Sequence, residues 1–331
     1  MPPLLDIHLY VHGRGRGHAS RALHLVAALA SRGHRARVFA GRDAVAALAG
    51  VVTTTAIESL PPVAGLEALA TAARRLRGDV ARIFAQRPDV VVSDGDLPSL
   101  CAARACGVPS VAVGHGLVFL VCARPLGLPR LPWWREALKA GVASLGARRR
   151  IAVNFTRLPL RDPTAVLAAP RSVARSTAAE PREVLAYFRD GLDARLLAAI
   201  REAAPTAQIF APRGPRGVRP PDRVAFAEAF ARARAVIATA GSQLIGECVA
   251  SGTPLLAVHR RGDDEQRLNA ELLARTGLGG SAAIDAVDAS MLRAFLERAP
   301  LLRRHPAIVP PGIDASTAVI DACEQLAGGS P

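Results

Sequence analysis

The chain has 331 residues, a length that suits two domains of about 150 residues each. Half of the residues are apolar and 21% are charged, so both domains can bury a core. The net charge of +14 comes almost entirely from arginines spread along the chain, and aromatic residues make up only 4%. Nucleic-acid binding needs a gathered basic face and often aromatic stacking platforms, so we expect no nucleic-acid partner.

Membrane-spanning and secreted classes are also disfavoured. No apolar run reaches the roughly 20 residues that cross a bilayer, and the N-terminal residues lack the basic segment and cleavage site of a signal peptide. The cysteines show neither a CxxC pair nor metal-ligand spacing; they are Cys101, Cys106, Cys122, Cys248 and Cys323. We expect a cytoplasmic protein with buried thiols, whose basic surface still suits phosphorylated substrates or anionic lipid headgroups.

In the first half, short apolar strands alternate with longer amphipathic helices, as in parallel α/β sheets. The expected strands are 5–13, 34–41, 88–96, 108–116 and 148–156, and the expected helices are 19–33, 66–87 and 97–107. Residues 157–181 then lose this periodicity and collect Pro, Ser and Arg, which is typical of a linker. We therefore expect an N-terminal domain over residues 1–156.

The alternation restarts after the linker. The expected strands are 182–188, 206–212, 235–241 and 254–260, and the expected helices are 193–203, 224–233, 242–252, 264–277 and 315–329. This predicts a second domain over residues 182–331, whose final helix can pack back on the first. The fold class is α/β, with two Rossmann-like doubly wound domains that face each other across a cleft lined by the strand ends.

The stretch HGRGRGHASR, residues 12–21, links the first strand to the first helix. Its glycines are spaced G-x-G-x-G, whereas a dinucleotide site has G-x-G-x-x-G and an acidic residue at the end of the second strand. Here that strand ends without an acid, so a nicotinamide or flavin site is disfavoured. A tight turn explains the glycines, but it does not explain His18 between them and the helix.

The second half contains the most informative segment, ATAGSQLIGECVASGTPLLAVHRRGDDEQRLNAELLARTGLG, residues 238–279. Thr239, Gly241 and Ser242 end a strand and open a helix, where free backbone N–H groups suit a diphosphate. Glu247 lies further along this helix, where a carboxylate can bind two vicinal ribose hydroxyls. Carboxylates and amides that suit sugar hydroxyls crowd the end of the next strand and the turn after it; with His259 they are Asp264, Glu265, Gln266 and Asn269.

This segment resembles the donor half of GT-B fold glycosyltransferases, which show the pattern AGxxxxxE…GxPxL…EQxxNA. It is most similar to family 28, the relatives of the bacterial N-acetylglucosaminyltransferase that completes lipid II, and to the macrolide and plant transferases of family 1. The opening GRGRGHASRALHLVAALASRGHRARVFAG resembles the pattern GxGHxxRxxxLAxxLxxRGHxVxF of the same enzymes. The middle of the chain, about 120–220, matches only loosely.

The resemblance implies roles for these residues. His18 would be the general base that deprotonates the acceptor hydroxyl, since a free imidazole titrates near neutrality. Asp94, in PDVVVSDGD, would orient that imidazole, although Asp96 lies close enough to take its place. The expected donor-binding set comprises Gly15, Gly17, Thr239, Gly241, Ser242, Gln243, Glu247, His259, Asp264, Glu265, Gln266 and Asn269.

The remaining candidates keep alternatives open. Val224 and Phe226 are candidates for the nucleobase site; the alternative is that they belong to an apolar helix face that packs on the sheet. His115 would touch the acceptor or serve the structure. Trp133 and Trp134 stand beside basic residues on an amphipathic helix, and they suit a membrane interface, the wall of an acceptor pocket or the core.

We expect a glycosyltransferase that moves a hexose from a nucleotide-diphosphate sugar to a hydroxyl acceptor with inversion. UDP is the favoured carrier and dTDP the second, and the acceptor is a small molecule or is lipid-linked. Asp94 and Asp96 form a D-x-D, the metal mark of a different transferase fold, but the GT-B resemblance predicts neither metal nor cofactor. The alternatives are a nucleotide-sugar 2-epimerase or hydrolase of the same fold and a non-catalytic partner protein. Peripheral membrane contact and the oligomeric state stay open.

Overall fold

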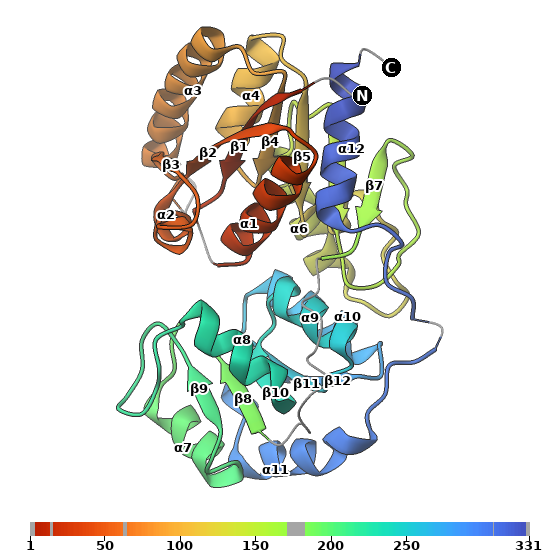
Figure 1. The fold of residues 1–331 in the computed structure, drawn as a ribbon. Coiled ribbons are helices and arrows are strands. Elements are labelled where there is room, and N and C mark those ends of the chain that lie inside the picture. Colours follow the sequence, from red (N-terminus) through yellow and green to blue (C-terminus); the bar gives the residue numbers. More distant parts are fainter. Residues whose placement is uncertain (1–3, 14–15, 62–64, 171–182, 307, 329–331) are drawn as a thin grey trace.

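The computed structural model describes residues 4–13, 16–61, 65–170, 183–306 and 308–328. Within them the chain forms two parallel sheets, each flanked by helices on both faces (Figure 1). The first sheet contains β1 (Asp6–Val11), β2 (Arg35–Ala40), β3 (Thr54–Ala56), β4 (Val90–Asp94), β5 (Ser110–Gly114), β6 (Arg149–Val153) and β7 (Ala165–Ala168). The second contains β8 (Glu183–Tyr187), β9 (Gln208–Phe210), β10 (Ala233–Thr239), β11 (Leu255–His259) and β12 (Gly279–Ala283).

The first sheet has the strand order β3-β2-β1-β4-β5-β6-β7. Apolar side chains of α1 (Arg16–Ser31), α2 (Arg42–Leu48) and α12 (Ala315–Ala327) cover one face, and those of α3 (Leu66–Gln86) and α4 (Leu97–Ala105) cover the other. Successive strands are added on one side of β1 up to β3 and on its other side from β4 onwards, so the pair β1 and β4 forms the topological switch point. The loops after β1 and β4 therefore diverge and leave an opening at their carboxyl ends.

The second sheet has the order β12-β11-β10-β8-β9, with its switch point between β8 and β10. Apolar residues of α8 (Arg223–Ala231), α9 (Ser242–Ser251) and α10 (Asp264–Ala274) pack on the face that adjoins the first half. Those of α7 (Ala194–Ala203) and α11 (Ala289–Arg298) pack on the other face. Two short 3-10 turns, Ile284–Ala286 and Ala299–Leu301, flank α11.

One apolar core continues across the two halves. Residues of α5 (Leu117–Val121) and α6 (Arg130–Ala143) belong to the same buried cluster as residues of α9 and α10. The chain also crosses back at its end, because α12 packs on α1 and on β4 to β7 of the first sheet (Figure 1). The two halves are therefore joined by packing as well as by the connecting chain.

Two expectations about the middle of the chain need correction. We expected 148–156 to be the last strand of the first half and 157–181 to be a linker, but β7 lies within that segment and pairs with β6. The strand has only four residues and stands at the sheet edge, where Val166 is exposed, so it lacks a readable alternation. Of the expected linker, residues 171–181 lie outside the described residues.

Aspartate side chains fix where six of the twelve described α-helices begin. Asp96, Asp193 and Asp222 each accept a hydrogen bond from a backbone N–H in the first turn of the following helix. Asp263, Asp288 and Asp314 do the same for α10, α11 and α12. Each such cap is worth about 1 kcal/mol. By contrast, Gly241 precedes α9 and no side chain caps that helix in the described structure.

Among the described residues, no helix combines the length and apolarity that crossing a membrane requires. The cysteines within these ranges are all free thiols.

Candidate active site

A cavity of about 1220 Å³ lies between the two halves, and both of them line it. Single-ligand pockets usually occupy about 300–1,000 Å³, so the space suits two substrates bound side by side. The first half contributes residues from the loops after β1, β4 and β5 and from α1 and α6. The second contributes the ends of β8 and β10, α8, α9 and the start of α10. The cavity thus joins the two switch points.

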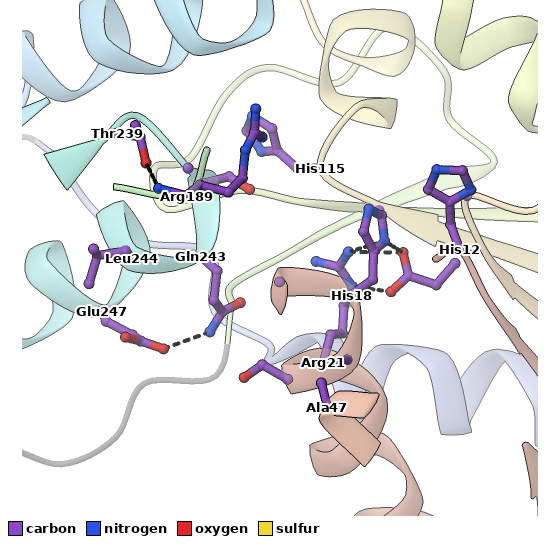
Figure 2. A pocket seen from close by; sticks show the side chains of 18 of the residues that line it. His12, His18, Arg21, Ala47, His115, Arg189, Thr239, Gln243, Leu244 and Glu247 are labelled. Atoms are coloured by element: carbon purple, nitrogen blue, oxygen red, sulfur yellow. Dashed lines mark hydrogen bonds and ion pairs between the residues drawn. The ribbon is translucent and has the colours of Figure 1, made fainter. Parts of the chain in front are cut away.

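His18, Asp94 and Arg21 form a hydrogen-bonded group on the first-half wall (Figure 2). His18 Nδ1 lies 2.8 Å from Asp94 Oδ1. Arg21 Nε and Nη2 donate to Asp94 Oδ2 and Oδ1 at 2.8 and 2.9 Å. Since a carboxylate only accepts, the contact places the proton on Nδ1 of the imidazole. In neutral His18 the lone pair is then on Nε2.

The ionisation of Asp94 is controlled by opposing effects. Burial by itself raises the pKa of this carboxyl, whose side chain is only 2% exposed. The nearby Arg21 guanidinium and His18 outweigh the burial and hold the pKa of Asp94 well below its usual range. Asp94 therefore stays negative, and it can hold the imidazole and stabilise it once protonated.

Asp96, the alternative partner of His18, is engaged elsewhere. Its side chain accepts from the Ser99 N–H to cap α4 and from Arg75 Nη2 at 3.0 Å. Arg75 also binds the buried Asp79, so this ion-pair group belongs to the packing of α3 on α4. The D-x-D sequence thus separates into one cavity carboxylate and one helix cap.

Gly95 lies between them with φ +77°, a conformation that favours glycine. A Cβ at this position would lie 3.3 Å from His12 Cβ and 3.5 Å from His18 Cε1. The turn is therefore shaped around the imidazole groups of the cavity wall.

The opening glycines have different surroundings. A side chain on Gly13 would collide with the backbone of Gly41, so this glycine permits two loops to approach each other. A Cβ on Gly17 would lie 3.8 Å from Gln243 Cβ, which puts the start of α1 beside the start of α9. Gly15, an expected donor-binding residue, lies outside the described residues.

The donor-side candidates gather at the start of α9. Thr239, Gly241, Ser242, Gln243 and Glu247 all line the cavity. Gln243 Nε2 donates to Glu247 Oε1 at 3.0 Å (Figure 2). Burial raises the pKa of Glu247 and Gln243 opposes this only in part, so the carboxylate gains by accepting hydrogen bonds from a ligand. Within the described part of the chain no side chain caps α9, and the N-terminal end of a helix favours an anion.

Arg189 is a cavity residue that sequence reasoning missed. It follows β8 at the second switch point, and its backbone N–H donates to Thr239 Oγ1 at 3.2 Å. Its guanidinium binds Asp190 at 3.2 Å and lies 3.6 Å from Asp263, so it is held beside the start of α10. Its position directly after an expected strand was a usable signal, since loops after strands carry the ligand contacts of such sheets.

The nucleobase candidates lie in an aromatic corner of the cavity. The Phe226 ring meets Tyr187 edge-on at 5.4 Å, and both residues line the space. It also contacts Phe210 and is stacked against Phe230. Val224 lines the same region at its exposed rim. Phe226 thus packs against other aromatic rings and also lines the cavity, so a nucleobase site and a packing role are compatible for this residue.

Three expected donor residues are absent from the cavity lining: His259, Gln266 and Asn269. Gln266 and Asn269 are only 2% and 1% exposed and are among the buried residues of α10. In the same turn Asp264 and Glu265 do line the cavity. The motif residues of α10 therefore divide between two cavity residues at its start and two buried residues that follow.

Of the acceptor-site candidates His115, Trp133 and Trp134, the structure places His115 in the cavity lining. Both ring nitrogens of His115 lie against oxygens inside the protein, Val153 O and Asn269 Oδ1, so neither nitrogen is free for an acceptor substrate. Since both oxygens accept, the two hydrogen bonds form together when both ring nitrogens carry a proton. Trp133 is buried against Phe119 in the core. Trp134 is 65% exposed on the outer face of α6, and neither tryptophan lines the cavity.

The first-half wall also contains residues that sequence reasoning did not select. His12 lines the cavity with its ring 5.6 Å from that of His18 (Figure 2). Glu136 and Lys139 of α6 line it as an ion pair at 2.6 Å. Lys139 is the only lysine in an arginine-rich chain, a compositional signal that could have marked it. Within the described ranges, no cluster of three or more His, Cys, Asp or Glu side chains is arranged to hold a metal ion.

Two family models match the chain in succession. The model described as Glycosyltransferase Family 4 matches residues 15–157, and the one described as Glycosyl transferase family 1 matches residues 213–300. These segments contain the residues that line the cavity apart from His12, Tyr187 and Arg189. No curated protein sequence matches the chain significantly.

Solved structures match nearly the whole chain. MurG from Acinetobacter baumannii is 15% identical with a TM-score of 0.62, over 98% of this chain and 100% of that one. The spinosyn forosaminyltransferase SpnP is 20% identical with a TM-score of 0.60, over 99% and 96%. A putative UDP-N-acetylglucosamine 2-epimerase from Listeria monocytogenes is 13% identical with a TM-score of 0.61, over 98% and 96%. The chain therefore has the GT-B fold of two facing Rossmann-like units and resembles the GT-B glycosyltransferases of families 28 and 1.

Proposed function

We propose that the protein is an inverting, metal-independent glycosyltransferase that moves a hexose from a UDP-linked donor to a hydroxyl acceptor. The observation that carries this proposal is the single cavity between two complementary walls. One wall holds His18 on an ionised carboxylate, and the other presents the uncapped start of α9 with Glu247. In this assignment the first sheet with α12 binds the acceptor and the second sheet binds the donor.

The chemistry follows from these positions. The acceptor O–H gives its proton to His18 Nε2 while its oxygen bonds to the anomeric carbon, and Asp94 stabilises the resulting imidazolium. The bond from the anomeric carbon to the diphosphate breaks on the opposite side, and the diphosphate leaves with the bonding electrons. Backbone N–H groups of α9 and the Arg189 guanidinium stabilise that charge, which is why we propose no metal requirement.

Glu247 would bind the ribose hydroxyls, and Phe226 with Tyr187 would face the base. Asp264 and Glu265, at the start of α10, would accept from the sugar hydroxyls. Uridine is the proposed base and thymidine the second choice.

The test is a transfer assay in EDTA with UDP-N-acetylglucosamine, UDP-glucose and dTDP-glucose as donors. The acceptors are a soluble phenol and a sugar linked to polyprenyl diphosphate, and NMR reports the anomeric configuration of the product. We expect transfer with inversion, and a loss of about 10²–10⁴-fold in His18→Ala, the usual value of a general base. Unchanged turnover in His18→Ala, or retention of configuration, would contradict the proposal.

A second function uses the same donor site without an acceptor. Glu136 supplies a carboxylate on the first-half wall, and burial raises its pKa, as suits an acid or base acting on the sugar itself. A 2-epimerase or hydrolase would convert UDP-N-acetylglucosamine when it is incubated alone. Glu136→Gln would then abolish that conversion, whereas a transferase leaves the donor largely intact until an acceptor is added.

The outer face of α6 favours a lipid-linked acceptor. Leu131, Trp134, Leu138 and Val142 are each more than half exposed along one side of this helix, and its other side lines the cavity. The exposed Arg135 lies beside this apolar stripe. We propose that α6 rests on an anionic membrane surface, so that vesicles with phosphatidylglycerol sediment the protein and Trp134→Ala weakens this. Equal sedimentation of the variant would contradict it.

A further inference from the structure

A buried chain of hydrogen bonds connects the two halves beside the cavity. His115 follows β5, and its Nδ1 lies 2.9 Å from Val153 O at the end of β6. Its Nε2 lies 2.5 Å from Oδ1 of Asn269, which belongs to α10 of the second half. Asn269 Nδ2 donates in turn to Ala240 O at 3.1 Å. The chain therefore runs from the first sheet to the residue that precedes Gly241 and Ser242.

The imidazole of His115 is held firmly in place. Its ring meets Phe119 edge-on at 5.5 Å and is stacked on Phe155 at 6.4 Å. His115 is 5% exposed and Asn269 1%. If a mutation removed their hydrogen bonds, water could not easily replace them. A buried polar link of this kind fixes the separation of the elements that it joins.

Ala240 is where this link meets the donor site. Its carbonyl belongs to the segment that enters α9, whose first residues line the cavity and carry Gln243 and then Glu247. The start of α9 also lies against the start of α1, because Gln243 Cβ is 3.8 Å from the Cβ position of Gly17. A shift of Ala240 would therefore move the α9 N–H groups relative to His18.

We propose that His115 and Asn269 form an interdomain clasp that positions the Ala240–Ser242 loop for the donor diphosphate. The proposal rests on the proposed function for the identity of the ligand. In the clasp His115 is a positioning residue, since it acts on the ligand only through Asn269 and the loop. The clasp explains why the motif residue Asn269 is buried although it lies in the donor half.

Two conservative replacements of His115 separate the links. The amide of a glutamine reaches about as far as Nε2 of histidine, so His115→Gln keeps the bond to Asn269 and loses the one to Val153. The shorter asparagine reaches about as far as Nδ1, so His115→Asn keeps the bond to Val153 and loses the one to Asn269. Each variant removes one hydrogen bond, but only His115→Asn breaks the clasp.

The first readout is amide hydrogen exchange of residues 240–243 in the nucleotide-free protein. We expect exchange about tenfold faster in His115→Asn and nearly unchanged in His115→Gln, as befits one lost hydrogen bond. Asn269→Asp, which accepts from His115 but cannot donate to Ala240 O, should match His115→Asn. Equal exchange in the two His115 variants would overturn the clasp.

The second readout is the affinity for UDP by calorimetry in EDTA. We expect the Kd to rise about tenfold in His115→Asn and to stay within about threefold of wild type in His115→Gln. If UDP binds all variants alike and their exchange is alike, the clasp is wrong and the donor site stands. If wild type binds no UDP but the exchange separates the variants, the clasp stands and the proposed donor is wrong.

Discussion

At the scale of single residues, the active-site wall depends on how Asp94 is kept charged. Burial favours the neutral acid, and Arg21 reverses this by binding both carboxylate oxygens in a planar fork. The same two bonds fix the direction of the carboxylate, and thus the direction in which it holds His18. Arg21 therefore both keeps the partner of the base ionised and orients it.

Arg21→Gln tests this role. Without the guanidinium, the pKa of buried Asp94 rises and the carboxylate loses its fixed direction, so kcat should fall at least about tenfold with unchanged affinity for UDP. Steady-state kinetics with calorimetry measures both quantities. Arg32→Gln, one residue after the same helix, removes a guanidinium that binds Asp321 of α12 and lies outside the cavity lining, so this control should leave kcat unchanged. A fall of similar size in both variants would contradict the assigned role of Arg21.

Sequence reasoning found the residues that stand at strand ends and helix starts. Parallel-sheet topology and the motif pointed to candidates that line one cavity: His18, Asp94, Thr239, Gly241, Ser242, Gln243 and Glu247. It did not separate Gln266 from Glu265, because a motif does not show which side of a helix faces a ligand. It missed Arg21 despite the R in the quoted pattern, since its partner Asp94 is 73 residues away along the chain.

At the scale of elements, the turns after the strands carry the geometry of the site. The β4–α4 turn needs a left-handed residue between Asp94 and the cap Asp96, and Gly95 supplies it. On the other side, β10 leads into α9 at Gly241, and the N-terminal end of this helix faces the cavity. In each half, a glycine therefore stands at the turn where the ligand is expected.

Gly95→Ala tests the first turn. The left-handed backbone should cost about 1–2 kcal/mol of unfolding free energy, and the added Cβ beside His12 and His18 should lower kcat further. Gly107→Ala is a close control, because Gly107 has φ +69° and its Cβ would meet nothing within 4 Å. Urea unfolding and kinetics should show similar destabilisation in both variants and a loss of kcat in Gly95→Ala alone. Equal kcat in the two variants would show that the turn does not shape the site.

Strand β1 carries a pH-sensitive group in the core. His8 is fully buried beside Tyr10 and Phe39, and burial lowers its pKa from 6.5 to about 4. The native state thus binds fewer protons than the unfolded chain between these values. The stabilising effect of neutral His8 is complete above pH 6.5 and is lost as the pH falls towards 4. Over this range the free energy of unfolding decreases by about 3 kcal/mol.

His8→Leu should remove that part of the acid sensitivity. Urea unfolding between pH 7 and 4 is expected to show a smaller fall of unfolding free energy in the variant than in wild type. Ile7→Val, on the same strand without a titrating group, should run parallel to wild type. Parallel curves for His8→Leu and wild type would show that His8 does not titrate in this range.

The sequence also predicted long elements better than short ones. The expected helices and central strands are present, because their apolar pattern extends over several turns or an entire buried strand. Helices α2, α5 and α11 were not among the expected elements. The short strand β3 and the edge strand β7 were missed as well, and so was β12 with its Gly-Gly start. Their pairing is decided by neighbouring strands, so their own residues show little periodicity.

At the scale of the whole molecule, two connections keep the walls of the cavity together. The apolar cluster that joins α5 and α6 to α9 and α10 is the first, with the His115–Asn269 link inside it. The second is α12, which returns from the second half to cover the first sheet. Arg32 and His34 bind the acidic residues of α12 and fix where it lies along α1.

A chain that ends at residue 313 tests the second connection. Loss of α12 would expose apolar residues of α1 and of the central strands, so we expect insoluble protein or loss of cooperative unfolding. A chain that ends at Gly328 keeps the helix and should behave like the full chain. Soluble yield and thermal unfolding report the outcome. A soluble, cooperatively folding chain without α12 would contradict its place in the first core.

The most direct measurement of the central claim is UDP binding by titration calorimetry in EDTA. It compares wild type with His18→Ala and Glu247→Ala. If the cavity has an acceptor wall and a donor wall, UDP binds wild type without metal. The Kd for UDP of His18→Ala then lies within about threefold of the wild-type value. Glu247→Ala should then bind at least about tenfold more weakly, because its ribose contacts are lost. No binding of UDP to wild type, or equal binding in Glu247→Ala, would contradict the account of the donor wall.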